Sequence, residues 1–207
     1  VNAGANLTVA DTVTGGAGND ILNILTDNTT SDLNNVTQVE RIVLQDDGGP
    51  YSYSIGNVSA FDNDGTIVTV DGSALDAGGV ETLTFDASTL SRGIILIGGG
   101  SGDTLTGGSS TDTLLGGLGN DVLTGNNGND TFVVRGNGEQ TAGDTVSGGG
   151  GTDTLLALKD NIGGSNETFV LDAGVTSVEQ LNVRNQAFNN SAFNPDHLTD
   201  VARNNGT

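Results

Sequence analysis

Aspartate is the residue with which this chain could do chemistry, and it recurs at a nine-residue spacing. From Gly98 to Val133 the chain reads GGGSGDTLT, GGSSTDTLL, GGLGNDVLT and GNNGNDTFV. The sixth residues of these units are Asp103, Asp112, Asp121 and Asp130. Carboxylate and backbone carbonyl oxygens are the ligands that hard divalent cations, above all Ca²⁺, prefer. Carboxylates spaced regularly beside glycine-rich turns therefore predict cation sites.

Four further units keep the same pattern on either side of this block. EQTAGDTVS and GGGGTDTLL follow a five-residue interruption at 134–138, and NLTVADTVT and GGAGNDILN lie near the start of the chain. Their sixth residues are Asp144, Asp153, Asp11 and Asp20. Ser101 and Ser110 replace the glycine at the fourth position of their units, and Asn126 replaces the glycine at the second position of its unit. Asparagine is a mild replacement in a turn because it tolerates a left-handed φ.

Each unit divides into a six-residue turn and a short strand with one large apolar residue facing inward. If two units make one coil, residues 18 apart in the sequence stack on the same side. Five extra residues then lengthen one turn without changing which unit lies above which. The carboxylates form two ladders, with the stacked pairs Asp103/Asp121, Asp112/Asp130, Asp121/Asp144 and Asp130/Asp153.

Stacked strands lie ~4.8 Å apart, so bare carboxylates along a ladder would repel each other. Ca²⁺ ions between successive turns remove that repulsion, and their binding free energy then contributes to folding. Mg²⁺ fits less well because it demands a tight octahedron. Glycine carbonyls complete the predicted ligand set, from Gly99, Gly108, Gly117, Gly119, Gly128, Gly149 and Gly151. The alternative is that the aspartates only form Asx-turns on a solvated surface, an alternative that is stronger for Asp11 and Asp20.

Composition excludes many other functions. The chain of 207 residues has 34 Gly, no Cys, one His and 26 acidic against 6 basic residues, which gives a net charge of -20. Zinc fingers, disulfide scaffolds and cysteine nucleophiles are excluded, and no HExxH motif is present. Strong negative charge repels nucleic acid. The longest strictly apolar run is only 94–97, so no membrane span is expected. We expect neither catalysis nor a nucleic-acid partner.

The nonapeptide GGxGxDxUx, in which U is a large apolar residue, resembles the RTX (repeats-in-toxin) calcium-binding repeat. The units beginning at Gly15, Gly116 and Gly148 match it at every defined place. The resemblance implies several structural Ca²⁺ ions and a bacterial protein that folds after type I secretion, outside the cell or on its surface. We predict an all-β fold, a right-handed parallel β-roll or β-solenoid with irregular flanking β coils and a short C-terminal capping helix.

The segments around the repeats suggest four parts. These are N-terminal RTX units (1–26), an irregular β-solenoid or β-sandwich spacer (27–97), the main calcium-binding β-roll (98–156), and a C-terminal β coil with a capping helix (157–207). An Asn-Pro pair and a late glycine predict the helix over 194–206, on which His197 is an exposed residue without a ligand role. Turn formation is the favoured role of the remaining acidic pairs, Asp46 with Asp47 and Asp62 with Asp64. Since the chain starts at Val1, we expect a fragment or a processed product.

A second pattern recurs between the repeats, in VERIVLQD, VETLTFDA and VEQLNVRN. Alternation of apolar residues predicts strands. Glu40, Glu81 and Glu179 are interpreted as residues of a solvated strand face, in preference to ligands or partners of Arg41 and Arg184. Such strands interleaved with nonapeptides resemble large bacterial surface proteins, including S-layer proteins and adhesins.

Three functions are compatible with these features. The favoured one is a structural calcium-binding module of an S-layer or adhesin that self-associates into a lattice or fibre, with cell-surface polysaccharide as a further candidate partner. The first alternative is the C-terminal module of a type I-secreted protease, lipase or epimerase. The second is a carbohydrate- or ice-binding adhesive domain, for which no regular Thr-x-Thr array is present outside the nonapeptides.

Overall fold

The computed structural model describes residues 2–3, 11–24, 31–33, 35–46, 53–56, 68–75, 81–135, 139, 143–159 and 174–185. Within these ranges the regular elements are all β-strands, and every strand pairing is parallel. No described helix is long and apolar enough to cross a membrane. The helix predicted over 194–206 and its His197 lie outside the described residues, as do Asp47, Asp62 and Asp64.

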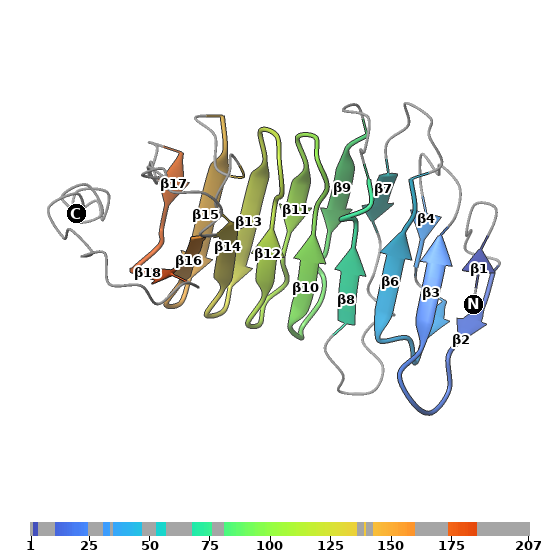
Figure 1. Ribbon diagram of the computed structural model, residues 1–207. Coiled ribbons are helices and arrows are strands. Elements are labelled where there is room, and N and C mark those ends of the chain that lie inside the picture. The colour runs from blue at the N-terminus through green and yellow to red at the C-terminus, as the bar shows by residue number, and fades with distance from the viewer. Residues whose placement is uncertain are drawn as a thin grey trace, which may run out of the picture.

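Two facing sheets contain most strands of the described residues, and their coils follow one another from the N-terminal to the C-terminal end (Figure 1). The first sheet has nine strands, in the order β1 (Asn2–Ala3), β3 (Ile21–Ile24), β6 (Arg41–Leu44), β8 (Val68–Asp71), β10 (Ile94–Ile97), β12 (Thr113–Leu115), β14 (Thr131–Arg135), β16 (Thr154–Lys159) and β18 (Gln180–Asn185). The second has seven, in the order β17 (Val175–Thr176), β15 (Thr145–Gly150), β13 (Val122–Asn127), β11 (Thr104–Thr106), β9 (Leu83–Asp86), β7 (Tyr53–Gly56) and β4 (Ser31–Asp32). A separate pair joins β2 (Val13–Thr14) to β5 (Val36–Thr37).

Neighbouring strands in the nonapeptide block are two apart in chain order, so each coil contributes one strand to each sheet. Leu96 of β10 pairs with Leu114 of β12, and Leu105 of β11 pairs with Leu123 of β13. This is the stacking expected when two nonapeptides make one coil. The prediction of an all-β parallel β-roll is confirmed.

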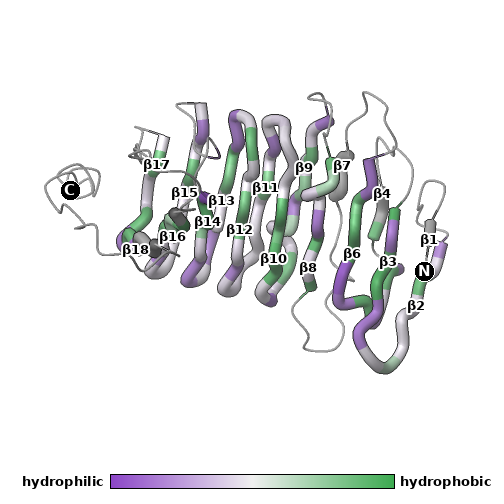
Figure 2. The backbone as a smooth tube through the Cα atoms, in the orientation of Figure 1, coloured by the Kyte–Doolittle hydropathy of each residue, from purple (hydrophilic) through white to green (hydrophobic). Residues whose placement is uncertain are grey.

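A continuous apolar core fills the space between the sheets. Alternate strand residues face inward, as in β3, where Leu22 and Ile24 are buried and Ile21 is exposed. The eighth residues of the central units are all buried: Leu105, Leu114, Leu123 and Phe132. Figure 2 shows the resulting apolar segments along the strands of both sheets. The repeat therefore orders a chain with only 34% hydrophobic residues, because one apolar residue per unit suffices when coils stack.

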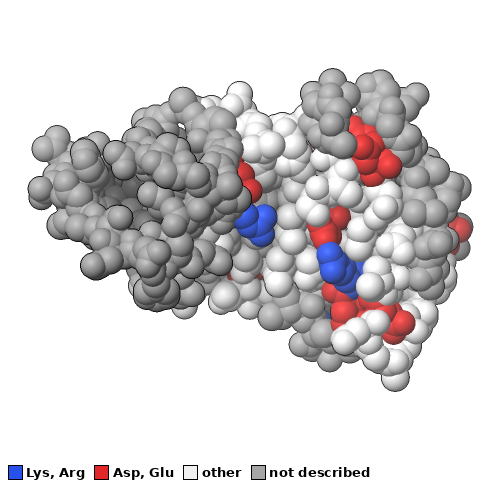
Figure 3. Space-filling model, in the orientation of Figure 1, with Lys and Arg blue, Asp and Glu red and all other residues white. Residues whose placement is uncertain are grey.

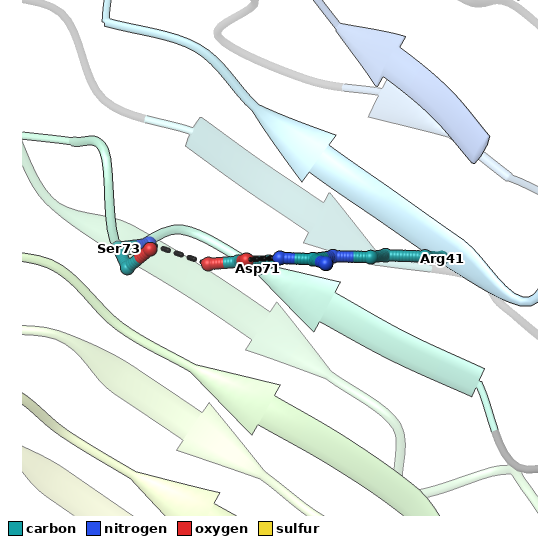
Figure 4. A network of polar contacts seen from close by, with 3 residues as sticks. All are labelled: Arg41, Asp71 and Ser73. Carbon is teal, nitrogen blue, oxygen red and sulfur yellow. Dashed lines mark hydrogen bonds and ion pairs between the residues drawn. The ribbon is translucent and has the colours of Figure 1, made fainter.

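The spacer joins this same architecture. Strands β6, β8 and β10 are successive neighbours in the first sheet, and β7 and β9 are neighbours in the second. Arg41 on β6 pairs with Asp71 at the end of β8, and the backbone N–H of Ser73 donates to Oδ1 of Asp71 at 3.0 Å (Figure 4). Burial alone would raise the pKa of Asp71, but the hydrogen bonds from Ser73 and Arg41 outweigh it and lower that pKa. Arg41 thus binds an aspartate of the next coil instead of one of the glutamates.

Candidate metal centre

The aspartates of the nonapeptides lie at the turn ends, directly before the strands. Asp103, Asp121 and Asp144 precede strands of the second sheet and form the first ladder. Asp112, Asp130 and Asp153 precede strands of the first sheet and form the second ladder. Each ladder therefore runs along one sheet, with one carboxylate per coil.

Hydrogen bonds tie each ladder together from coil to coil. In the first ladder, Asp103 N donates to Asp121 Oδ1 and Asp121 N donates to Asp144 Oδ1, both at 2.8 Å. In the second, Asp112 N donates to Asp130 Oδ1 and Asp130 N donates to Asp153 Oδ1, again at 2.8 Å. The four predicted stacked pairs are thus confirmed as neighbours, across the five-residue insertion as well.

The ladders begin on apolar residues. Leu83 N donates to Asp103 Oδ1 at 2.7 Å, and Ile94 N donates to Asp112 Oδ1 at 2.9 Å. These positions carry no side chain that could join a cation site. The carboxylate of each following coil still satisfies their backbone N–H, so the first oxygen of each aspartate has a structural function whether or not metal is bound.

Two glutamates accept the same kind of coil-to-coil bond along the first sheet, a role that the sequence did not predict. Asp153 N donates to Glu179 Oε2 at 2.7 Å, and Asp20 N donates to Glu40 Oε2 at 2.6 Å. Glu81 is only 2% exposed. The interpretation of the glutamates as a solvated strand face is therefore wrong for Glu81, whereas Glu40 is half-buried and Glu179 is exposed although each accepts a backbone N–H of the preceding coil. Glu40 and Glu179 each lie two residues before the inward apolar residue of a Val-Glu-x-U segment. The aspartate of the nonapeptide occupies the same position relative to its apolar residue.

The ladder carboxylates are buried, with exposed fractions from 0% for Asp112 and Asp153 to 7% for Asp144. Burial raises the pKa of Asp121 to about 7, and the charges of Asp103, Asp144 and Glu139 add to that rise. Burial likewise raises the pKa of Asp112 and of Asp130 to about 6. The pKa of Asp153 is also raised, first by burial and then by the charge of Glu179. Ionised carboxylates at these positions need a compensating positive charge.

The second oxygens of two aspartates fit a cation. Within the described part of the chain, Oδ2 of Asp130 and Oδ2 of Asp153 are buried and accept no hydrogen bond, and the same holds for Oδ2 of the half-buried Asp20. No group of three or more acidic or histidine side chains converges among the described residues. Backbone carbonyls and water, both of which Ca²⁺ accepts readily, are therefore the further ligands available to a cation at these oxygens.

Glycines bring such carbonyls close. A Cβ atom on Gly117 would lie 2.0 Å from the carbonyl oxygen of Gly99, and one on Gly151 would lie 1.7 Å from that of Gly128. Both glycines have positive φ, of 102° and 135°. Backbone turns of successive coils are thus in direct contact where the aspartates stack, and only glycine allows this approach.

The remaining candidates divide by burial. Asp20 is half-buried and its backbone N–H is bonded to Glu40 of the next coil. Asp11 is exposed, unlike every ladder carboxylate. On the face drawn in Figure 3, acidic side chains of the described residues form a few patches, and the ladder carboxylates are themselves buried. Asp11 therefore lacks the enclosed surroundings that distinguish the ladders.

One of three comparisons with known proteins identifies the repeats that carry the ladders. Neither the curated proteins nor the solved structures gave a match. A family model of the RTX calcium-binding nonapeptide repeat matches in four copies, over residues 10–24, 97–132 and 142–161. These ranges contain all six aspartates of the two ladders and Asp20. The chain therefore contains RTX calcium-binding nonapeptide repeats over these residues.

Proposed function

We propose that this chain is a structural calcium-binding module of a secreted bacterial cell-surface protein, such as an S-layer protein or an adhesin. The observation that carries the calcium part is the pair of buried, unbonded carboxylate oxygens, Asp130 Oδ2 and Asp153 Oδ2. A buried carboxylate oxygen without a donor is costly unless a cation or a proton neutralises it.

Carboxylates from both ladders, together with that of Asp20, would hold Ca²⁺ with carbonyls of the stacked turns, for which the candidates are Gly99, Gly108, Gly117, Gly119, Gly128, Gly149 and Gly151. The ion supplies positive charge between like charges. The chain's own residues orient the carboxylates through the coil-to-coil N–H bonds and exclude water through the adjacent apolar core. Calcium binding would then be coupled to folding.

A surface role is supported by the interleaving of nonapeptide coils with Val-Glu coils in one solenoid. The stacked coils continue from β1 to β18 with an apolar interior. Among the described residues, the end strands β1, β18, β17 and β4 pair on one side only, and such strand edges would allow end-to-end association with a second copy. We further propose that the four parts 1–26, 27–97, 98–156 and 157–207 act as segments of this single solenoid.

Calcium titration with magnesium as the control tests this function. Far-UV circular dichroism and light scattering follow the full chain from chelated buffer to millimolar Ca²⁺. We expect a gain in β-structure with Ca²⁺ but not with Mg²⁺, and a growth in particle size. Folding without any growth would favour the module of a secreted enzyme. A chain that is fully folded in chelator and indifferent to calcium would contradict the proposal.

A further inference from the structure

The six nonapeptide turns that the structure describes throughout are of two conformational kinds. In four turns, the second and fourth residues have positive φ: Gly16 and Gly18, Gly117 and Gly119, Asn126 and Gly128, Gly149 and Gly151. We call these four the Gly-type turns (15–20, 116–121, 125–130 and 148–153). In the turns 98–103 and 107–112, which are described throughout, no residue has positive φ. We call these two the Ser-type turns, because Ser101 and Ser110 occupy their fourth place.

Residue type explains the difference. A left-handed φ costs a residue with a Cβ roughly 1–2 kcal/mol, whereas glycine adopts it freely. Ser101 and Ser110 therefore keep their turns out of the conformation that glycine permits at the same place. The second residue, Gly99 or Gly108, changes conformation with the fourth although it is glycine itself.

This change decides what the second oxygen of the aspartate contacts. In the Ser-type turns, Gly99 N donates to Asp103 Oδ2 at 2.7 Å and Gly108 N donates to Asp112 Oδ2 at 2.6 Å. Both oxygens of these aspartates thus accept backbone hydrogen bonds. In the Gly-type turns, Oδ2 of Asp130 and Oδ2 of Asp153 accept none within the described residues, although these aspartates are 1% and 0% exposed.

We propose that calcium binds at the Gly-type turns only, and that the Ser-type turns are metal-independent. In the Ser-type turns a backbone N–H already occupies the place at the carboxylate that the cation takes elsewhere. Asp130 and Asp153 are then ligands through Oδ2, while Asp103 and Asp112 are structural acceptors. This inference rests on the proposed calcium binding and narrows it to particular turns.

The number of bound Ca²⁺ ions in variants that lack one aspartate tests whether only the Gly-type turns bind calcium. Equilibrium dialysis with elemental analysis gives the number of Ca²⁺ ions per full-length chain. We expect Asp130→Asn and Asp153→Asn each to lose ~1 ion, since a carboxylate ligand is removed. Asp103→Asn and Asp112→Asn should lose none, even where the amide group lowers the melting temperature. Equal loss in both sets would overturn the inference.

A gain of binding provides the test that misfolding cannot imitate. Ser101→Gly allows the left-handed conformation, frees Asp103 Oδ2 from Gly99, and should add ~1 ion per chain. Ser101→Ala removes the same hydroxyl but keeps the Cβ, so its ion count should equal that of the unchanged protein. If Ser101→Gly binds no additional ion, the inference is wrong. If the unchanged protein binds no calcium at all, the proposed function itself fails.

Discussion

A single aspartate in these ladders performs two tasks with its two oxygens. Oδ1 of Asp153 accepts the backbone N–H of Asp130, whereas its Oδ2 is buried without a hydrogen-bond partner in the described structure. The first oxygen is a building element of the solenoid, and only the second is available to a cation. Replacement of such an aspartate therefore removes both a ligand and part of the charge that makes the metal-free coil unstable.

The burial of these carboxylates also makes the stability of the folded chain depend on pH. The folded pKa values of Asp112, Asp121 and Asp130 are raised to about 6, 7 and 6, above the value of about 3.9 of an unfolded aspartate. The folded state therefore binds protons more tightly than the unfolded state, and stability falls as pH rises from about 4 to about 7. In chelator we expect the melting temperature to be higher at pH 4.5 than at pH 7.5, by about 5 °C or more.

Saturating calcium should remove or invert that pH trend, because bound Ca²⁺ requires ionised carboxylates. Thermal melts followed by circular dichroism at both pH values, with chelator and with calcium, provide the four measurements. Asp71 acts in the opposite direction, since its lowered pKa contributes stability that is lost only as pH falls below about 4. A chelated protein that is more stable at pH 7.5 than at pH 4.5 would show that the ladder carboxylates are not strained by their burial.

At the scale of the element, a turn is defined by its contact with the turn before it. Gly16 and Gly117 hold the same place in their units, with φ of 107° and 102°. A Cβ on Gly16 would meet nothing within 4 Å, whereas one on Gly117 would lie 2.0 Å from the carbonyl oxygen of Gly99. The two positions therefore separate the cost of a left-handed φ from the cost of a collision between coils.

Substituting alanine at both positions measures these two costs. Gly16→Ala should lower the free energy of unfolding by ~1 kcal/mol, because only the backbone conformation is strained. Gly117→Ala should cost ~2 kcal/mol or more beyond that, since two backbone segments have to move apart. Denaturant unfolding in saturating calcium provides the comparison. Equal losses for the two variants would mean that the turns of successive coils are not packed against each other.

Much of this element could be predicted, and the failures have physical causes. The nine-residue spacing was enough to stack Asp103 under Asp121, because backbone pairing and apolar side chains repeat with it. The function of Glu179 was missed because its coil does not follow that spacing, although its side chain reaches the same backbone N–H. The hydrogen bond of Gly99 to Asp103 Oδ2 depends on the φ of a glycine, which adopts either sign freely.

The stability of the whole molecule depends on two opposing contributions, a continuous apolar core and a large negative charge. The core is one cluster of buried residues that extends from Leu22 to Ala157, and the described strands of each sheet are hydrogen-bonded in coil order. The net charge of -20 opposes compaction. Exposed charges are screened by ordinary salt within ~10 Å at 0.1 M, but buried pairs are screened much less.

Sodium chloride and calcium should therefore act differently on the chelated chain. Raising NaCl to ~0.5 M should stabilise it only in part, since salt screens the surface charges but not the buried ladders. A small addition of Ca²⁺ at that salt concentration should still give a further gain of β-structure in circular dichroism. Full folding in NaCl alone would contradict this expectation. It would mean that repulsion between surface charges, and not between the ladder carboxylates, destabilises the chelated chain.

The uneven lengths of the coils have a consequence for related sequences. The same N–H to carboxylate bond joins residues 18 apart at Asp112 and Asp130, 23 apart at Asp130 and Asp153, and 26 apart with glutamate at Asp153 and Glu179. Closing a loop that is five residues longer costs only about 0.2 kcal/mol, so insertions at these turns are nearly neutral to evolution. Chains of this construction can thus drift in length while their number of coils stays constant. The number of coils in such a chain should therefore be estimated from the acidic residues that lie two places before an inward apolar residue. Dividing the chain length by 18 would give a wrong number.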